Sequence, residues 1–259
     1  MDENMHYCFY RSYYDELKKV KKLTELDRDQ NIKENIRKKN EEIWNFKIKS
    51  NKNKEEQIGN TKFELKVCYP GLLAGIGILH EIGVKDEIKL GFQLDYTTGH
   101  PYIPGSSIKG MLRSIFREEK KIFVKEQLKQ ITKKEWSDRD LEQLEDFIFG
   151  GDESRESTKI EQDIFFDAQL INNSNLTVFE KEYITPHNEV LENPIPLMML
   201  KINPGNKIRF QFDLKDTQFQ NEKGIKKELK KAQKEILFKN IFLTFGVGAK
   251  TNVGYGVLK

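Results

Sequence analysis

The chain has 259 residues, of which 37% are hydrophobic and 33% charged, a balance typical of a polar globular protein rather than of a disordered chain. The formal net charge of +3 is too small to indicate a partner, so the distribution of charge must be examined instead. Two cysteines, Cys8 and Cys68, provide neither a disulfide framework nor a metal-binding quartet. We expect a soluble, cytoplasmic protein, because the sequence shows no signal peptide and no apolar run long enough to cross a bilayer.

The first 60 residues are predicted to form an N-terminal helical extension. A helix is expected over residues 11–40, where apolar positions are sparse and lysine and arginine dominate. Such a basic run usually forms a solvated helix face, although contact with a polyanion is the alternative. The polar stretch 51–60 is then expected to be a linker to a second domain over residues 61–259.

Two strands with alternating apolar residues are predicted next. Phe63, Leu65, Val67 and Tyr69 share one face of the first strand. The second strand is predicted over residues 88–96, where every other position is apolar. A glycine-broken connection separates the two strands.

The stretch 99–116 predicts a loop that runs directly into an amphipathic helix. The apolar positions Ile108, Met111, Leu112, Ile115 and Phe116 form one stripe, and Ser106 is the expected N-cap. We expect this loop to present the amides of Ser106, Ser107 and Ile108 as an anion site. Lys109 and Arg113 lie one turn apart on the polar side, so they either add to that site or are ordinary solvated side chains.

A helical, acidic insertion is predicted at about 120–162. Ser137 and Asp140 have the spacing of a capping box, and Gly150 is expected to end the helix. Residues 135–163 contain eleven acidic and three basic side chains, without the spacing of a calcium loop or a metal triad. We expect this segment to face solvent or a protein neighbour, because its carboxylates would repel a phosphate chain.

The remaining elements complete an α+β pattern. Strands are predicted over residues 163–171, 176–180 and 203–214. A basic helix follows over 223–240, with Ile225, Leu229, Ala232 and Ile236 facing the core, and a short strand ends the chain. The coarse order of strand, helix, strand, strand, helix, strand is that of a ferredoxin-like, or RRM-like, fold, which by itself implies no function.

The last predicted loop is rich in glycine, with Gly246, Gly248, Gly254 and Gly256 flanking Lys250, Thr251 and Asn252. It does not fit a nucleotide-binding P-loop, because Ala249 replaces the required glycine and too little chain follows for the helix. The glycines permit close approach of the backbone to a long polyanion. A tight turn into the last strand is the alternative.

No acid–base or metal constellation is predicted. The four histidines lack zinc-ligand spacing, and His187, in a proline-rich loop, would need a partner that the sequence cannot place. We therefore expect no enzymatic activity, no cofactor and no metal. An RNA-cleaving enzyme that uses His187 or His80 as its base is the alternative, as is a scaffold that contacts only protein.

Several of these stretches resemble the RAMP superfamily of CRISPR-associated proteins. The pair "GHPYIPGSSIKGMLR" and "GVGAKTNVGYG" carries the resemblance to the superfamily. "DAQL" at 167–170, "YITPHNEVLENPIP" at 183–196 and the form of the last loop are similar to the sixth RAMP subunits of the Cmr, or type III-B, effector complex. "YCFYRSYYDEL" matches the start of that family less well.

The resemblance implies a RAMP fold and a non-catalytic, RNA-binding subunit in antiviral defence. Such a subunit would cap the RAMP backbone near the three-prime end of the guide RNA, beside other RAMP and small subunits. The resemblance also allows target RNA as a further partner. Two other roles stay open: an endoribonuclease that processes precursor guide RNA, and a RAMP subunit of a type III-A complex. Carried over by position, the RNA contacts would be Ser106, Ser107, Lys109, Arg113, Gly246, Gly248, Lys250, Thr251 and Asn252.

Overall fold

A computed structural model of the chain describes residues 4–19, 29–48, 58–74, 84, 86–89, 91–151, 162–171, 176–184 and 196–259. The helices are α1 (Met5–Tyr10), α2 (Gln30–Trp44), α3 (Gly105–Ile115), α4 (Lys121–Thr132), α5 (Asp138–Phe149) and α6 (Lys231–Phe245), with short 3-10 helices at η1 (Ser12–Lys19), η3 (Glu118–Lys120) and η5 (Thr251–Val253). The strands are β1 (Thr61–Lys66), β2 (Tyr102–Ile103), β3 (Ile164–Phe165), β4 (Ala168–Ile171), β5 (Phe179–Ile184), β6 (Leu197–Ile202), β7 (Lys207–Asp213), β8 (Thr217–Gln220) and β9 (Lys226–Leu229). This mixture confirms the predicted α+β class.

The central sheet is antiparallel and is built around β7. Its strand order is β1-β7-β4-β2, and β3 also pairs with β7. Phe63 of β1 lies opposite Phe210 of β7, and buried and exposed residues alternate along β1 as its sequence predicts. Beyond β1, Val67 forms an isolated bridge with Leu258. In place of the expected last strand, the chain end is joined to the β1 segment by this bridge, by two hydrogen bonds between Lys66 and Lys259, and by one from the Cys68 amide to the Val257 carbonyl.

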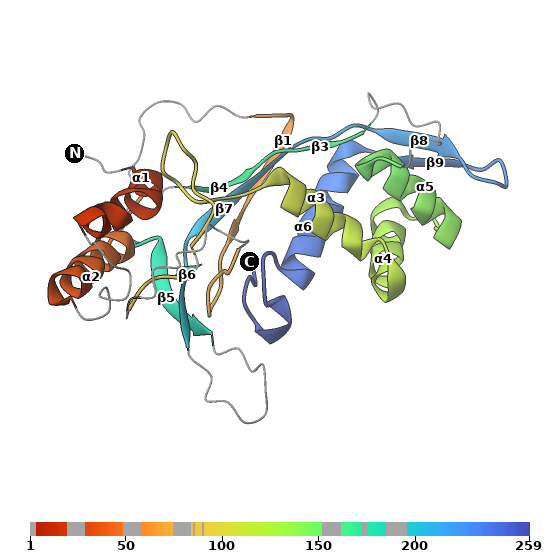
Figure 1. Cartoon of the computed structure of the whole chain (residues 1–259). Coiled ribbons are helices and arrows are strands. Elements are labelled where there is room, and N and C mark those ends of the chain that lie inside the picture. The colour runs from red at the N-terminus through yellow and green to blue at the C-terminus, as the bar shows by residue number, and fades with distance from the viewer. Residues whose placement is uncertain are drawn as a thin grey trace.

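Aromatic rings of β1 and β7 pack against α6, and α3 lies beside α6 over the sheet (Figure 1). The ring centroids of Phe210 and Phe242 are 4.3 Å apart, and Phe212 packs against Phe238 at 5.7 Å. From α3, Ile108 and Leu112 are fully buried, which confirms the predicted apolar stripe. These contacts fix α3 against the sheet.

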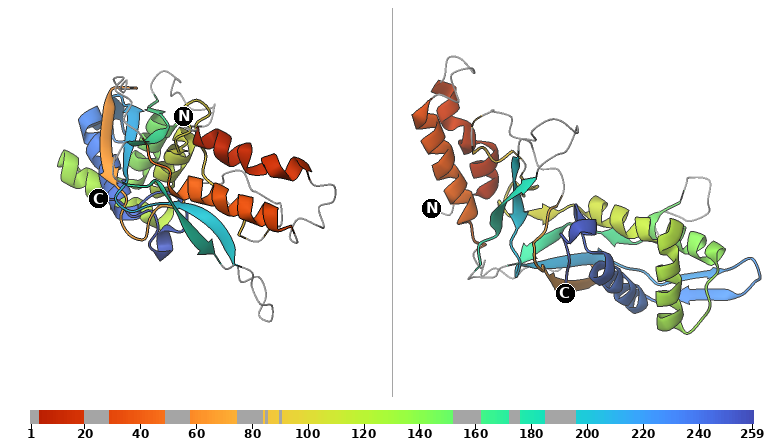
Figure 2. Two further views of the ribbon diagram at one scale, coloured as in Figure 1. Left: turned by 90° about the vertical axis from the view of Figure 1, so that its left-hand side faces the viewer. Right: turned by 90° about the horizontal axis from the view of Figure 1, so that it is seen from below.

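The N-terminal helices lie at one end of the molecule beside the β5–β6 hairpin (Figure 2). The helix predicted over 11–40 is confirmed in part: the described residues of that range hold the 3-10 helix η1 and the first part of α2, which begins at Gln30. Asp29 sets this start, because its side chain accepts a hydrogen bond from the amide of Asn31 at 2.8 Å. Of the predicted linker, residues 51–57 lie outside the described residues.

The strand predicted at 88–96 does not form. The described part of this segment has one isolated bridge, between Leu94 and Pro101, although Ile88 and Phe92 are buried as expected. Its backbone bonds to other groups: the amide of Ile88 donates to the Tyr13 hydroxyl at 3.1 Å, and the carbonyl of Phe92 accepts from the Tyr10 hydroxyl. The alternation thus reflects burial against the N-terminal helices instead of pairing in a sheet.

The helix predicted over 223–240 starts too early. Residues 217–229 form the β8–β9 hairpin, and the Asn221 side chain accepts hydrogen bonds from the amides of Lys223 and Ile225 in its turn. Ile225, Ala232 and Ile236 are exposed, against expectation, whereas Leu229 is buried. The buried side of α6 carries Lys234, Leu237, Phe238, Ile241 and Phe242.

The other strand predictions hold with shifts. The segment 163–171 contains β3 and β4, the segment 203–214 contains β7, and the strand predicted at 176–180 begins only at Phe179. The capping box of Ser137 and Asp140 is confirmed, as is the end of α5 at Gly150.

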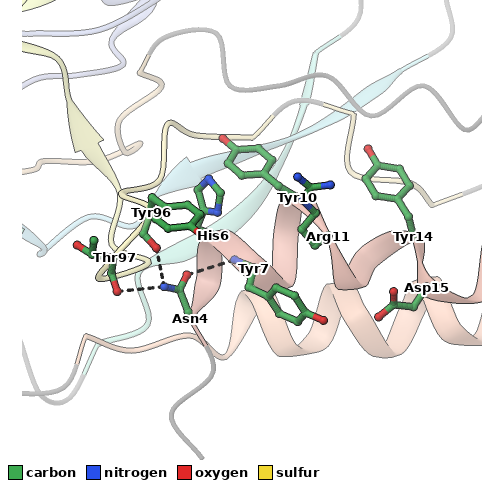
Figure 3. A pocket seen from close by; sticks show the side chains of 9 residues that line it. All are labelled: Asn4, His6, Tyr7, Tyr10, Arg11, Tyr14, Asp15, Tyr96 and Thr97. Atoms are coloured by element: carbon green, nitrogen blue, oxygen red, sulfur yellow. Dashed lines mark hydrogen bonds between the residues drawn. The ribbon is translucent and has the colours of Figure 1, made fainter.

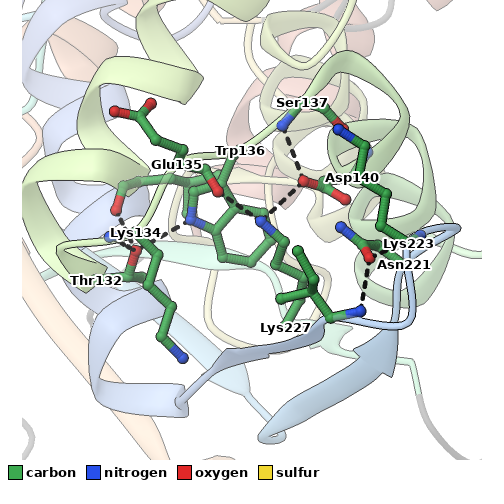
Figure 4. Close-up of polar contacts among 11 residues, drawn as sticks. Thr132, Lys134, Glu135, Trp136, Ser137, Asp140, Asn221, Lys223 and Lys227 are labelled. Atoms are coloured by element: carbon green, nitrogen blue, oxygen red, sulfur yellow. Dashed lines mark hydrogen bonds and ion pairs between the residues drawn. The ribbon is translucent and has the colours of Figure 1, made fainter.

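Asp140 also anchors the β8–β9 hairpin to α5 (Figure 4). The Lys227 ammonium lies 3.0 Å from the Asp140 carboxylate and 5.2 Å from the centroid of the Trp136 ring. Burial alone would raise the pKa of Asp140, but hydrogen bonds from Ser137, Lys227 and Asn221 outweigh it and lower that pKa. The hairpin is thus held by an ion pair that requires an ionised carboxylate.

A second buried ion pair joins α6 to the start of β3. The Lys234 ammonium donates to both carboxylate oxygens of Asp163, at 2.7 and 2.9 Å, and both side chains are fully buried. Asp163 also accepts from the amide of Lys215. The expectation that the segment 135–163 faces outward is therefore wrong for Asp140, Glu145 and Asp163, which are buried and paired with basic side chains.

We predict that Lys234→Met lowers the free energy of unfolding by about 3–5 kcal/mol, because the Asp163 carboxylate is left buried without its cation. The double variant Asp163→Asn with Lys234→Met is the control. The double variant leaves no buried charge and keeps an acceptor for the Lys215 amide, so it should lower the free energy of unfolding by less than Lys234→Met alone. Urea denaturation measures both, and a double variant less stable than Lys234→Met would contradict the prediction.

We predict that Asp140→Asn destabilises the protein at neutral pH and that its deficit shrinks on acidification. The folded-state pKa of Asp140 is lowered, so its stabilisation is present above the unfolded-state pKa and is lost as pH falls through the folded-state value. Denaturation midpoints between about pH 7 and pH 3 would show the wild type converging on the variant. Glu142→Gln, an exposed carboxylate on the same helix, is the control and should show little difference at any pH.

Candidate nucleic-acid interface

The start of α3 and the glycine-rich loop meet at one pocket. Its volume is about 280 Å³, and its walls include Ser107 and Met111 of α3, Tyr102 of β2, and Gly248 and Ala249 of the loop. The remaining lining residues are Ala74, Gln93, Ile103, Pro104 and Val247. The two stretches that the sequence singled out, far apart along the chain, therefore form opposite sides of one concave surface.

The glycine-rich loop is held by backbone contacts inside the protein. The amide of Ala249 donates to the carbonyl of Leu73 at 2.6 Å. Gly248 has a φ of +90°, and a Cβ there would lie 2.2 Å from the Leu73 oxygen, while a Cβ on Gly256 would lie 1.9 Å from the Val247 oxygen. At these glycines the loop backbone packs closely against other backbone of the same chain and not against open solvent. This favours the prediction of a tight turn over that of a loop whose backbone binds a polyanion.

The start of α3 differs from the prediction. Pro104 is the N-cap, so Ser106 is not, and Ser106 is exposed. The amides of Ser107 and Ile108 donate to the Pro104 carbonyl at 2.9 and 3.1 Å. The anion at this helix start is the protein's own, because the Asp167 carboxylate accepts from the Gly105 amide at 2.7 Å. The predicted site made of free amides is thus wrong for Ser107 and Ile108.

The cations of α3 form a row one turn apart: Lys109, Arg113 and, beyond the helix end, Arg117. Arg113 and Arg117 both donate to one oxygen of Glu145 on α5, at 2.7 and 2.8 Å. Two guanidinium groups share one carboxylate, so the cluster carries a net positive charge. Among the described residues, Lys109 has no ion-pair partner.

A second pocket, of about 350 Å³, lies at the far end of this row and is lined by Gly110, Arg113, Ser114, Arg117, Glu118 and Lys120. Sequence analysis missed Arg117 and Lys120. The four-residue spacing from Arg113 to Arg117 could have found the first, whereas Lys120 is brought near by the turn after α3.

Besides Ser106 and Lys109, the predicted contact residues are divided among four places. Ser107 and Gly248 line the 280 Å³ pocket, and Arg113 lines the 350 Å³ pocket. Gly246 is buried at the end of α6. Lys250, Thr251 and Asn252 are exposed at the η5 turn and line neither pocket.

Tyr102 and Gln93 are lining residues that the sequence did not indicate. Burial raises the pKa of Tyr102, and the carboxylates of Asp167 and Asp95 add to the effect, so its hydroxyl is neutral at physiological pH. No sequence signal marks Gln93, since it lies in a segment that was predicted to be a strand.

A larger concave surface than these two pockets lies elsewhere, beside α1 (Figure 3). It measures about 750 Å³ and is lined mainly by aromatic rings, among them Tyr7, Tyr10, Tyr14 and Tyr96. The Asn4 amide ties α1 to the opposite wall by donating to the carbonyls of Tyr96 and Thr97. This aromatic cleft shares no lining residue with the pocket beside α3.

The described part of the chain holds neither a metal cluster nor a membrane-spanning helix. No group of three histidine, cysteine or acidic side chains there is arranged to hold a metal ion. Within the same ranges, no helix combines the length and apolar character of a membrane span. His187 and His80 lie outside the described residues.

Comparison with known proteins identifies the family. No curated protein sequence matches the chain. A cryo-EM structure of the type III-B Cmr-beta complex bound to cognate target RNA contains a similar chain, with 25% identity and a TM-score of 0.49; the match covers 76% of this chain and 57% of that one. Cmr6 from Pyrococcus furiosus is 19% identical, with a TM-score of 0.45, and 76% of this chain and 95% of that one are covered. The model of the RAMP superfamily matches residues 64–259, well over half of the sequence, and the chain therefore belongs to the RAMP superfamily.

Proposed function

We propose that this chain is a non-catalytic, RNA-binding subunit of a type III-B CRISPR (Cmr) effector complex. In this role it caps the RAMP backbone near the three-prime end of the guide RNA in antiviral defence. The observation that carries the proposal is the meeting of the α3 start and the glycine-rich loop at one pocket. Membership of the RAMP superfamily supports it.

The finer fold assignment, ferredoxin-like, belongs to the same proposal. The order of elements β1, α3, β4, β7 and α6, followed by the Leu258 bridge, supports it. In space, Leu258 lies beside the chain of β1, then come β7 and β4. Both helices then belong on one face of the sheet, which leaves α3 available to line a binding surface.

The chemistry of the surface suits a phosphate chain bound without regard to sequence. Asp167 already neutralises the start of α3, so attraction must come from side chains instead of from helix amides. Lys109, Arg113 and Arg117 provide it along one helix face, with Glu145 offsetting one of the three charges. Contacts of this kind position RNA and do not read bases, as a subunit that serves many guides requires.

We predict that Lys109→Ala and Arg113→Ala weaken binding of unrelated guide RNAs to a similar extent. Each lost phosphate contact should lower the slope of log affinity against log salt by about 0.7, the single-strand value. Both changes leave the apolar stripe of α3 intact, so Lys109→Ala should change thermal stability little, whereas Arg113→Ala leaves the buried Glu145 carboxylate to Arg117 alone and should lower it. Lys226→Ala, an exposed lysine on the β8–β9 hairpin, is the matched control.

The measurement is RNA affinity at several salt concentrations, with the chain alone and within the reconstituted complex. Unchanged affinity and slope in both variants would rule out the phosphate contacts. An equal loss for Lys226→Ala would show a diffuse charge effect instead of a site.

We predict that the purified chain cleaves neither guide-repeat RNA nor target RNA, with or without Mg²⁺ or Mn²⁺. The reason is the lack of any acid–base or metal constellation in the sequence. Gel analysis of end-labelled RNA tests it. Cleavage that disappears in His187→Ala would replace this proposal with the endoribonuclease alternative.

A further inference from the structure

We propose that the 280 Å³ pocket beside α3 receives a ribose of the bound RNA, whose 2′-hydroxyl donates a hydrogen bond to the side-chain oxygen of Gln93. The inference rests on the proposed function, because it assumes that RNA crosses this surface. It adds a specific contact that distinguishes RNA from DNA.

The first observation is an unsatisfied acceptor. The Gln93 Oε1 atom is buried, and no donor among the described residues bonds to it. A buried polar atom without a partner costs free energy, so natural proteins keep few of them, and each that persists calls for a function or a bound partner. Gln93 is also one of the residues that line the pocket.

The second observation is that the wall containing Gln93 is fixed. The Gln93 carbonyl accepts from the Tyr102 amide at 3.1 Å, and the amide of Asp95 donates to the His100 carbonyl at 2.8 Å. Asp95 then closes the turn, because its carboxylate accepts from the amide and the hydroxyl of both Thr97 and Thr98. The fixed backbone keeps the Gln93 side chain beside the pocket, so a rotation of that side chain alone brings the Oε1 atom to a ligand there.

The third observation is the chemistry of the other walls. Ala74, Met111 and Val247 supply apolar contacts, Tyr102 supplies a ring, and Ser107 supplies a hydroxyl. A free acceptor repels a phosphate and attracts a donor, so the phosphate itself does not occupy this position. A ribose combines an apolar carbon face with hydroxyl donors, and therefore matches both the walls and the acceptor.

A sugar also fits better than a base edge. Amino groups differ from base to base, so a pocket that read them would restrict the guide sequence. Every RNA nucleotide carries a 2′-hydroxyl, which is the group that separates RNA from DNA at a single position.

The test uses the full chain and Gln93→Met, which keeps the approximate length of the side chain and removes the acceptor. Single-stranded RNA and DNA of the same sequence are compared, together with RNAs that carry one 2′-deoxy nucleotide at successive positions. Gln143→Met is the matched control, because the Gln143 Oε1 atom is also buried without a donor among the described residues but lines neither pocket near α3.

We expect the wild type to prefer RNA over DNA, and Gln93→Met to lose about three- to tenfold of that preference through weaker RNA binding, the usual range for one hydrogen bond. One 2′-deoxy position should lower wild-type affinity by the same factor and have no effect in Gln93→Met. The salt slope should not change, since no phosphate contact is removed. Gln143→Met should behave like the wild type.

An RNA preference that is equal in Gln93→Met and the wild type would overturn the ribose contact, as would a loss that follows base identity instead of the 2′-deoxy position. Should Gln93→Met fail to fold, the 2′-deoxy series on the wild type alone decides, because absence of any sensitive position overturns the contact. Failure of the proposed function looks different: the wild type would then bind RNA weakly and Lys109→Ala would leave the salt slope unchanged.

Discussion

The pairing of β7 with β1, β3 and β4 is the constraint on which the rest of the structure depends. β7 contributes Phe210 and Phe212 to the ring cluster that holds α6. Its pairing with β4 also places Asp167, which immediately precedes β4, against the first amide of α3. Since β1 leads into Leu73, the same strand network positions the backbone that binds the glycine-rich loop.

The two sides of the candidate site are therefore assembled through the sheet and not through direct contact between the two sequence motifs. One side begins at β2 and continues along α3, and the other is attached to the chain after β1 through the Leu73–Ala249 bridge. Distant segments thus determine both the width of the pocket and the charge around it. Glu145, from a helix outside the sheet, sets how much of the positive charge on Arg113 and Arg117 is neutralised.

Sequence reasoning succeeded where a local pattern had only one physical meaning. The alternation of β7, the apolar stripe of α3 and the capping box at Ser137 all appear as predicted. It failed at 88–96 because alternating burial can be satisfied by contact with the N-terminal helices. It failed at 223–229 because a short hairpin with an Asn221 turn looks like a continuation of the following basic helix.

The same limits apply to the candidate site. Ser107 and Gly248 could be predicted because proline and glycine mark their loops, and the structure brings both to one pocket. The sequence could not predict that Asp167 caps α3 or that Gln93 lines the pocket, since each role depends on a neighbour that is distant in sequence. No local pattern reports such a neighbour.

Because two arginines share Glu145, an anion that binds at the proposed site must displace a carboxylate that is already bound. A phosphate that approaches Arg113 or Arg117 replaces a carboxylate that is already bound there, so the contact gains only the difference between two anions. Short or stray polyanions then gain little at this position. Under the proposed function, a strand long enough to reach Lys109 as well adds a contact that needs no such replacement, so a long strand gains more than a short one.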